Sequence, residues 1–153
     1  MASHSVTHHL KTIENDIENI IDFELDWEKF SGQRVLVTGA SGFLGGYLVR
    51  TLLKLNENRI LDQPVTVVAM IRDAQQARFK LEDISQNKHL DFIEWDLKQI
   101  AVPNIGDCNF IIHCASLASP LHYSIDPVGT FLPNTSGTAA LLTAFGQIGR
   151  AHV

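Results

Sequence analysis

Residues 34–55 decide the fold of this chain, and they read RVLVTGASGFLGGYLVRTLLKL. The apolar run at 35–37 suits a buried strand. Three glycines then follow at equal spacing: Gly39, Gly42 and Gly45. Apolar residues next recur at helical intervals and predict one face of an amphipathic helix: Phe43, Leu44, Tyr47, Leu48, Leu52 and Leu55. Strand, glycine turn and helix in this order are the layout of a dinucleotide-diphosphate site.

Each glycine has its own physical role in such a site. Gly39 allows the tight turn out of the strand, and Gly42 leaves the backbone open to the diphosphate because it has no Cβ. Gly45 lets the helix pack close to the strand. The diphosphate is expected at the helix N-terminus, where unpaired N–H groups and the helix dipole favour an anion. The alternative is a glycine-rich turn without a ligand. The candidate cofactor contacts in this loop are Gly39, Ser41, Gly42, Phe43, Leu44 and Gly45.

The composition is that of one globular domain with a substantial core. The chain has 153 residues, of which 45% are hydrophobic and 19% charged. Its net charge of −5 lies entirely within residues 1–31, which hold two lysines and seven acids. This distribution argues against a nucleic-acid surface. The sequence shows no apolar run of membrane-spanning length and no signal peptide, so we expect a cytoplasmic protein without membrane contact.

Residues 1–31 are expected to form a helical acidic arm in front of the nucleotide domain. Two arrangements stay open: the arm packs on its own domain, or it docks on a partner subunit. Its apolar residues share one helical face: Leu10, Ile13, Ile17, Ile20 and Ile21.

The cysteines do not indicate a metal site. Cys108 and Cys114 are the only cysteines, and no histidines stand at ligand spacing from them. Both fall in or beside a predicted strand, which is typical of small core residues.

Three further strands are predicted at 65–71, 91–95 and 109–114, with a helix at 75–81. Another helix is expected to start near Asn134 and to pack its apolar face on the sheet. We therefore predict an α/β fold, the N-terminal half of a doubly wound parallel Rossmann sheet with strand order 3-2-1-4, formed by residues 32–147. The fourth strand is expected to lack a neighbour on one side, which would expose apolar surface and favour aggregation.

Two segments resemble the extended short-chain dehydrogenase/reductase family, which includes sugar-nucleotide epimerases, dehydratases and decarboxylases. Residues 38–48, TGASGFLGGYL, resemble the phosphate loop of that family. Residues 113–138, HCASLASPLHYSIDPVGTFLPNTSGT, resemble the segment after the fourth strand in UDP-glucuronate decarboxylases and dTDP-glucose 4,6-dehydratase-like enzymes. The resemblance covers about residues 32–147 and implies NAD as the cofactor.

At the adenosine end of the cofactor, the strand at 65–71 is followed by Arg72 and Asp73. Arg72 could pair with a 2′-phosphate of NADP, stack on the adenine of NAD, or be solvated. Asp73 could bind the ribose or cap the helix that starts near Ala74. The resemblance implies that Asp96, with Leu97 beside it, contacts the adenine amino group, while the residue type alone also fits a turn.

The resemblance also implies roles for residues after the fourth strand. Ala115 and Ser116 would line the cofactor, and Asn134 would order the active-site backbone and a water. A second group would lie towards the sugar-nucleotide pocket, although an ordinary polar loop is the alternative: Ser119, Pro120, His122 and Tyr123.

The catalytic pair of the resembling family, Tyr-x-x-x-Lys, does not occur in these residues. Tyr47 is followed four residues later by Thr51, and Tyr123 by Pro127. The pair is expected beyond residue 153, so this chain is predicted to be inactive by itself. The parent protein is expected to be an NAD(P)-dependent enzyme that acts on a nucleotide sugar, and a homodimer is one arrangement for it. The alternatives are an NADPH-dependent ketone reductase of the same superfamily and a non-catalytic dinucleotide-binding module.

The final residues, 148–153, read IGRAHV. This string matches the translation of a widely used sequencing adapter up to a stop codon. A non-native tail is therefore expected at 148–153, after a truncated domain.

Overall fold

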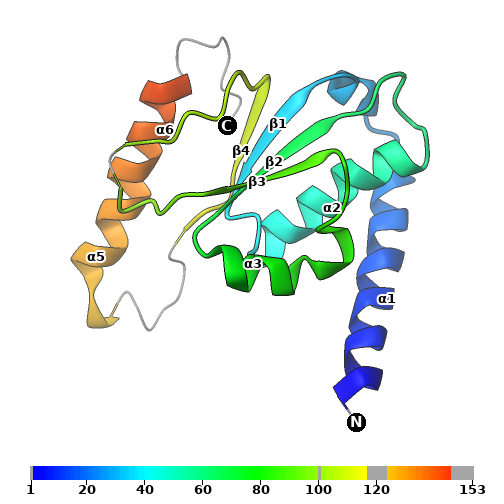
Figure 1. Ribbon diagram of the computed structural model, residues 1–153, viewed down its shortest axis with the longest axis horizontal. Coiled ribbons are helices and arrows are strands. Elements are labelled where there is room, and N and C mark those ends of the chain that lie inside the picture. Colours follow the sequence, from blue (N-terminus) through cyan, green and yellow to red (C-terminus); the bar gives the residue numbers. More distant parts are fainter. Residues whose placement is uncertain (1, 100, 117–123, 146–153) are drawn as a thin grey trace.

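A computed structural model describes residues 2–99, 101–116 and 124–145, with side chains from Leu10 onward, and shows one parallel sheet (Figure 1). The sheet has the order β3-β2-β1-β4, which confirms the predicted α/β class and topology. Each strand lies within one residue of its predicted bounds. The four strands are β1 (Arg34–Thr38), β2 (Thr66–Ile71), β3 (Leu90–Glu94) and β4 (Phe110–His113).

Helices cover both faces of this sheet (Figure 1). The first face packs on α1 (Ala2–Ile21), α2 (Phe43–Glu57) and α3 (Ala74–Lys80), and the second face on α6 (Thr138–Phe145). Successive side chains of β1 point to opposite faces of the sheet. Val35 and Val37 lie on the first face and Leu36 on the second, and all three are fully buried. Burial on both faces explains why the run at 35–37 is continuously apolar.

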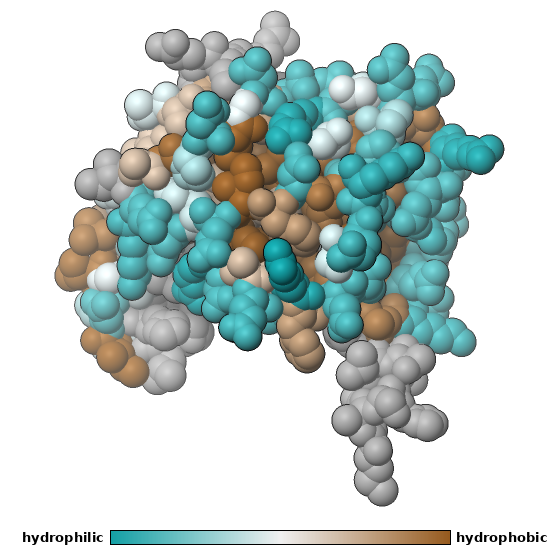
Figure 2. All heavy atoms as spheres, in the orientation of Figure 1, coloured by the Kyte–Doolittle hydropathy of each residue, from teal (hydrophilic) through white to brown (hydrophobic). Residues whose placement is uncertain are grey.

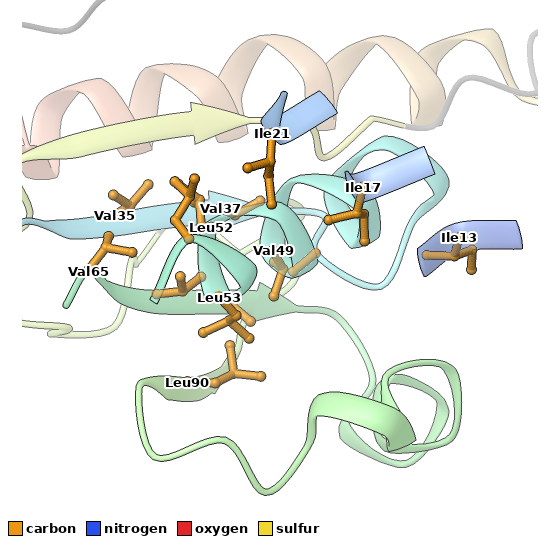
Figure 3. Close-up of a cluster of buried hydrophobic side chains, with 14 of the residues drawn as sticks. Ile13, Ile17, Ile21, Val35, Val37, Val49, Leu52, Leu53, Val65 and Leu90 are labelled. Atoms are coloured by element: carbon orange, nitrogen blue, oxygen red, sulfur yellow. The ribbon is translucent and has the colours of Figure 1, made fainter. Parts of the chain in front are cut away.

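The acidic arm packs on its own domain, which is the first of the two arrangements considered. Ile13, Ile17 and Ile21 are buried against the first-face core (Figure 3). The Tyr47 hydroxyl on α2 donates a hydrogen bond of 2.8 Å to Asp16, and Lys54 Nζ lies 3.1 Å from a carboxylate oxygen of Glu18. The acidic side chains of Asp16 and Glu18 therefore help to hold α1 on α2.

The amphipathic face predicted for α2 is wrong in its first turn. Phe43 and Leu44 are 78% and 65% exposed. Gly45, in the first turn of the helix, lies against Gly39 and Ala40. The start of the helix therefore packs on the loop after β1 and not on the strand. The large apolar side chains that the helix buries come further along: Val49, Leu52, Leu53 and Leu55.

The last helical region starts earlier than predicted. It begins with α5 (Pro127–Leu132), whose cap Asp126 accepts a 2.8 Å hydrogen bond from the Gly129 N–H, and not near Asn134. A single π-helical segment, Pro133–Gly137, joins α5 to α6. Pro133 has no N–H to place in an α-helical ladder, so the wider turn lets the helix continue past it.

The edge position of β4 agrees with the expected lack of a neighbour on one side, since β1 is its only partner in the sheet of the described residues. Apolar side chains also gather on the surface over α5 (Figure 2). Val128 and Phe131 are each 64% exposed. None of the helices within the described ranges is long and apolar enough to cross a membrane.

Candidate functional site

A groove of about 250 Å³ lies where the strands end at their carboxyl sides. Residues at the end of β1 and β2 and directly after the end of β3 and β4 line it, because carboxyl ends of parallel strands meet at one edge of a sheet. Eight of the predicted cofactor residues line it: Gly39, Ser41, Gly42, Arg72, Asp96, Leu97, Ala115 and Ser116. Asp73, for which a ribose contact was one of two predicted roles, also lines it. The remaining lining residues were not predicted as contacts: Thr38, Met70, Ile71, Gln76, Lys80, Trp95, Lys98, Cys114 and Pro133.

The glycine turn forms the floor of this groove in a shape that side chains would block. Gly39 has φ +64°, and a Cβ there would lie 2.7 Å from the backbone nitrogen of Ala115. A Cβ on Gly45 would lie 2.8 Å from the carbonyl carbon of Gly39 and 2.9 Å from Ala40 Cα. Gly39 therefore has the tight-turn role inferred for it, whereas the close helix contact inferred for Gly45 is made with the turn after β1 and not with the strand itself.

Gly42 differs, because its backbone is extended (φ −79°, ψ 177°) and a Cβ would meet only Gly39 O at 3.0 Å. It is exposed and is the N-cap of α2, to which it offers no side-chain hydrogen bond. The first-turn amides of α2 thus have no capping side chain and face the groove end of the helix. This arrangement fits an anion such as a diphosphate.

Charged residues gather at the β2–β3 side of the groove. Asp73 accepts a 2.9 Å hydrogen bond from the Gln76 N–H and caps α3, so capping is the contact that the structure shows for it. Asp96 accepts a 3.0 Å hydrogen bond from the Lys98 N–H, as a turn residue does, while it lines the groove. Arg72 is exposed and lines the same wall.

A hydrogen-bonded cluster that the sequence did not suggest lies under the β1–β4 side. The Thr38 hydroxyl accepts a 3.1 Å bond from the Ala115 N–H and lies 2.6 Å from His113 Nδ1. His113 Nε2 lies 3.1 Å from the Thr138 hydroxyl. Partial burial lowers the pKa of His113 below its ordinary value of 6.5, although part of the ring remains exposed.

Comparison with known proteins identifies the family. A model of the NAD dependent epimerase/dehydratase family matches residues 35–153. The chain belongs to this family. The resemblance drawn from residues 38–48 and 113–138 is thereby confirmed, and the family is NAD-dependent.

Individual members of the NAD dependent epimerase/dehydratase family cover much of this chain. It is 29% identical over 121 residues to UDP-glucuronic acid decarboxylase 2 of Arabidopsis thaliana, over 79% of this chain and 25% of that protein. It is 28% identical over 121 residues to UDP-glucuronic acid decarboxylase 6 of the same plant, over 78% of this chain and 32% of that protein. The chain therefore spans about a quarter to a third of the length of these relatives.

Solved structures show the same fold. The dTDP-glucose 4,6-dehydratase DesIV from Streptomyces venezuelae, with NAD and TYD bound, aligns with TM-score 0.64 and 23% identity, over 77% of this chain and 38% of that one. The UDP-Glc/GlcNAc 4-epimerase from Campylobacter jejuni aligns with TM-score 0.62 and 21% identity, over 77% and 35%. The four-stranded sheet of this epimerase/dehydratase family member is thus Rossmann-like.

Four predicted cofactor residues do not line the groove. Phe43 and Leu44 stand exposed on the first turn of α2, Gly45 is buried behind the glycine turn, and Asn134 donates a 2.9 Å hydrogen bond to the Thr130 carbonyl. The neighbour of Asn134, Pro133, lines the groove instead. The predicted substrate-side residues lie outside the described residues: Ser119, Pro120, His122 and Tyr123.

The two cysteines differ in their surroundings. Cys108 is buried in the second-face core as predicted, whereas Cys114 is only half-buried and lines the groove. Burial raises the pKa of both thiols, which favours the unreactive protonated form. Within the described part of the chain, no cluster of three or more His, Cys, Asp or Glu could hold a metal ion.

Proposed function

We propose that the groove binds NAD and that this chain is the cofactor-binding part of a sugar-nucleotide epimerase, dehydratase or decarboxylase. The observation that carries the proposal is the glycine turn. Gly39 and Gly45 bring the start of α2 against the carboxyl end of the sheet, and Gly42 leaves the first-turn amides uncovered. A dinucleotide diphosphate needs this combination of close backbone approach and unpaired donors.

The other groove residues divide between the two ends of the cofactor. Arg72 would stack on the adenine and Asp96 would accept from its amino group, because the two line the same side of the groove. Ala115 and Ser116 would lie beside the nicotinamide, since their small side chains leave room for a ring. NAD, when bound, would supply a hydride acceptor for the sugar.

The reaction on the sugar is a further part of the proposal. Similarity to UDP-glucuronic acid decarboxylases favours a decarboxylase and a UDP-sugar over the other reactions of the family. The substrate-side group at 119–123 would contact that sugar. Neither Tyr47 nor Tyr123 is followed by lysine at the fourth position, so we expect these 153 residues to bind the cofactor without turning over a sugar.

The test is calorimetric titration of the chain with NAD. Gly42→Val places a branched side chain next to the uncapped first-turn N–H groups of α2. Within the protein, its Cβ would meet only Gly39 O. We expect NAD to bind at least about tenfold more weakly. Thermal unfolding checks that the variant keeps its fold, and Gly46→Ala, on the buried side of the same turn, is the matched control. Equal affinities of Gly42→Val and the unchanged chain for NAD would refute the site.

A second function rests on the cations of the groove. Arg72, Lys80 and Lys98 line the wall proposed for adenosine, and three positive charges favour a 2′-phosphate. This favours an NADPH-dependent ketone reductase of the same superfamily. Parallel titrations with NAD and NADP discriminate the two, because tighter binding of NADP would favour the reductase.

A further inference from the structure

Two threonine hydroxyls and one imidazole form a continuous hydrogen-bonded relay beneath the groove. Thr38 ends β1 and His113 ends β4, and the two residues are register partners in the parallel sheet. Thr138 begins α6 on the second face of the sheet. The Thr38 hydroxyl lies 2.6 Å from Nδ1 of His113, and Nε2 of the same ring lies 3.1 Å from the Thr138 hydroxyl. One imidazole thus joins two strands and a helix.

The hydrogen bonds at the two ends of this relay decide which atom donates in the two bonds to His113. The Thr138 hydroxyl donates to the Asn134 carbonyl at 2.7 Å, so its single hydrogen is used and it must accept from His113 Nε2–H. A neutral ring that donates from Nε2 accepts at Nδ1, and the Thr38 hydroxyl therefore donates to it. The Thr38 oxygen then accepts from the Ala115 N–H at 3.1 Å. In this arrangement each polar side-chain atom of Thr38, His113 and Thr138 has a hydrogen-bond partner.

We propose that His113 is a positioning residue, held neutral in the Nε2–H form, which fixes Ala115, just after β4, against the glycine turn of the proposed NAD site. This inference rests on the proposed function. Ala115 is the residue that Gly39 approaches so closely that a Cβ would lie 2.7 Å from its nitrogen. The relay through Thr38 to Ala115 holds those two residues together. Its other end holds the π-helical segment that contains Pro133, a further groove residue.

Protonation of His113 would break this arrangement. A charged imidazole donates from both nitrogens, so Thr38 would have to accept from Nδ1–H as well as from the Ala115 N–H and lose the acceptor for its own hydrogen. No counter-charge compensates among the described neighbours. The β4, π-helical and α6 segments carry no other ionisable side chain, and the one on β1, Arg34, sits at the opposite end of that strand.

The first test reads the ring itself, without cofactor. In the chain labelled with ¹⁵N-histidine, the ring signals lost in His113→Gln are those of His113. At pH 7.5 we expect one nitrogen with the shift of an unprotonated acceptor at Nδ1 and one protonated nitrogen at Nε2. An Nδ1–H form, or a charged ring, would overturn the proposal.

The second test uses two threonines of α6. Thr138→Ala removes the acceptor of His113, whereas Thr143→Ala removes an equivalent hydroxyl that donates to the Ala139 carbonyl at 2.8 Å. Neither side chain lines the groove. We expect Thr138→Ala to speed hydrogen exchange at the Ala115 N–H and to weaken NAD binding about fivefold to tenfold, with Thr143→Ala within about twofold of the unchanged chain. Thr138→Ser should restore both properties.

The two readouts separate this inference from the proposed function. If exchange at Ala115 is the same in Thr138→Ala and Thr143→Ala, the positioning role is wrong. If the exchange differs but no variant binds NAD, the relay holds Ala115 as inferred and the proposed function fails. The NAD affinity of the unchanged chain should fall as the pH drops below 6.5, because His113 becomes protonated. The His113→Gln variant should not show this fall.

Discussion

The substitution Gly45→Ala tests the close contact between α2 and the glycine turn. The new Cβ would lie 2.8 Å from the Gly39 carbonyl carbon and 2.9 Å from Ala40 Cα, and ordinary van der Waals contact begins near 3.4 Å. The helix or the turn must move further than these two distances alone require, because the Gly39 carbonyl oxygen is nearer still to the new Cβ. All of the obstructing atoms belong to the backbone, so no side-chain rotation can relieve the contact. Overpacking of this kind destabilises by about 1–3 kcal/mol.

The adjacent glycine gives a matched control. A Cβ on Gly46 would lie 3.2 Å from Arg50 Nη1, so the guanidinium must shift by a few tenths of an ångström, and 3.6 Å from the Ala40 carbonyl oxygen. Gly46→Ala has the same composition as Gly45→Ala and gains the same helix propensity, about 1 kcal/mol. Effects on the unfolded chain are therefore nearly equal in the two variants. We expect Gly46→Ala to be neutral or slightly stabilising, and Gly45→Ala to be less stable than it by about 2 kcal/mol.

Urea denaturation, followed by far-ultraviolet circular dichroism, measures this difference as a shift of the midpoint at constant slope. NAD titration of both variants supplies a second measurement, because a displaced helix N-terminus moves the amides proposed to bind the diphosphate. Equal stability of Gly45→Ala and Gly46→Ala would show that α2 does not need glycine at position 45. The close contact would then have no energetic consequence.

Four further substitutions test individual side chains. Arg72→Ala should weaken NAD and NADP binding by similar factors in calorimetric titrations if Arg72 stacks on adenine, and a loss confined to NADP would instead indicate a 2′-phosphate partner. Asp83→Asn should lower the free energy of unfolding by about 2 kcal/mol in urea, because Arg50 is 8% exposed and donates two bonds of 2.7 Å to Asp83. Asp91→Asn, from an exposed ion pair, should cost under about 1 kcal/mol, and a larger loss than that of Asp83→Asn would contradict the comparison. Ile17→Ala on α1 should cost about 2–5 kcal/mol by the same assay, and a negligible change would mean that the arm is not held on α2.

The strands and their order could be predicted because each leaves a local signal. An apolar, β-branched run such as 35–37 suits a strand with two covered faces, and parallel strands with helical crossovers allow few orders. The late helix could not be placed in this way. Pro127 and Gly129 suggest a loop, but Asp126 caps the N–H of Gly129, and the π-helical segment accommodates Pro133. These effects depend on geometry that periodicity does not encode.

The relay beneath the groove shows a different limit. Thr38 and His113 are 75 residues apart and belong to no common motif. Their meeting nevertheless follows from the fold, because order 3-2-1-4 makes β1 and β4 neighbours and both strands end at the groove. The last residues of two adjacent parallel strands must then lie side by side, and polar ones there will bond to each other or to what the groove holds. The contact between Thr38 and His113 was thus predictable once the strand order was known, and Thr38 of this pair lines the groove. Their pairing with Thr138 was not predictable, because it depends on the helix start that the sequence obscured.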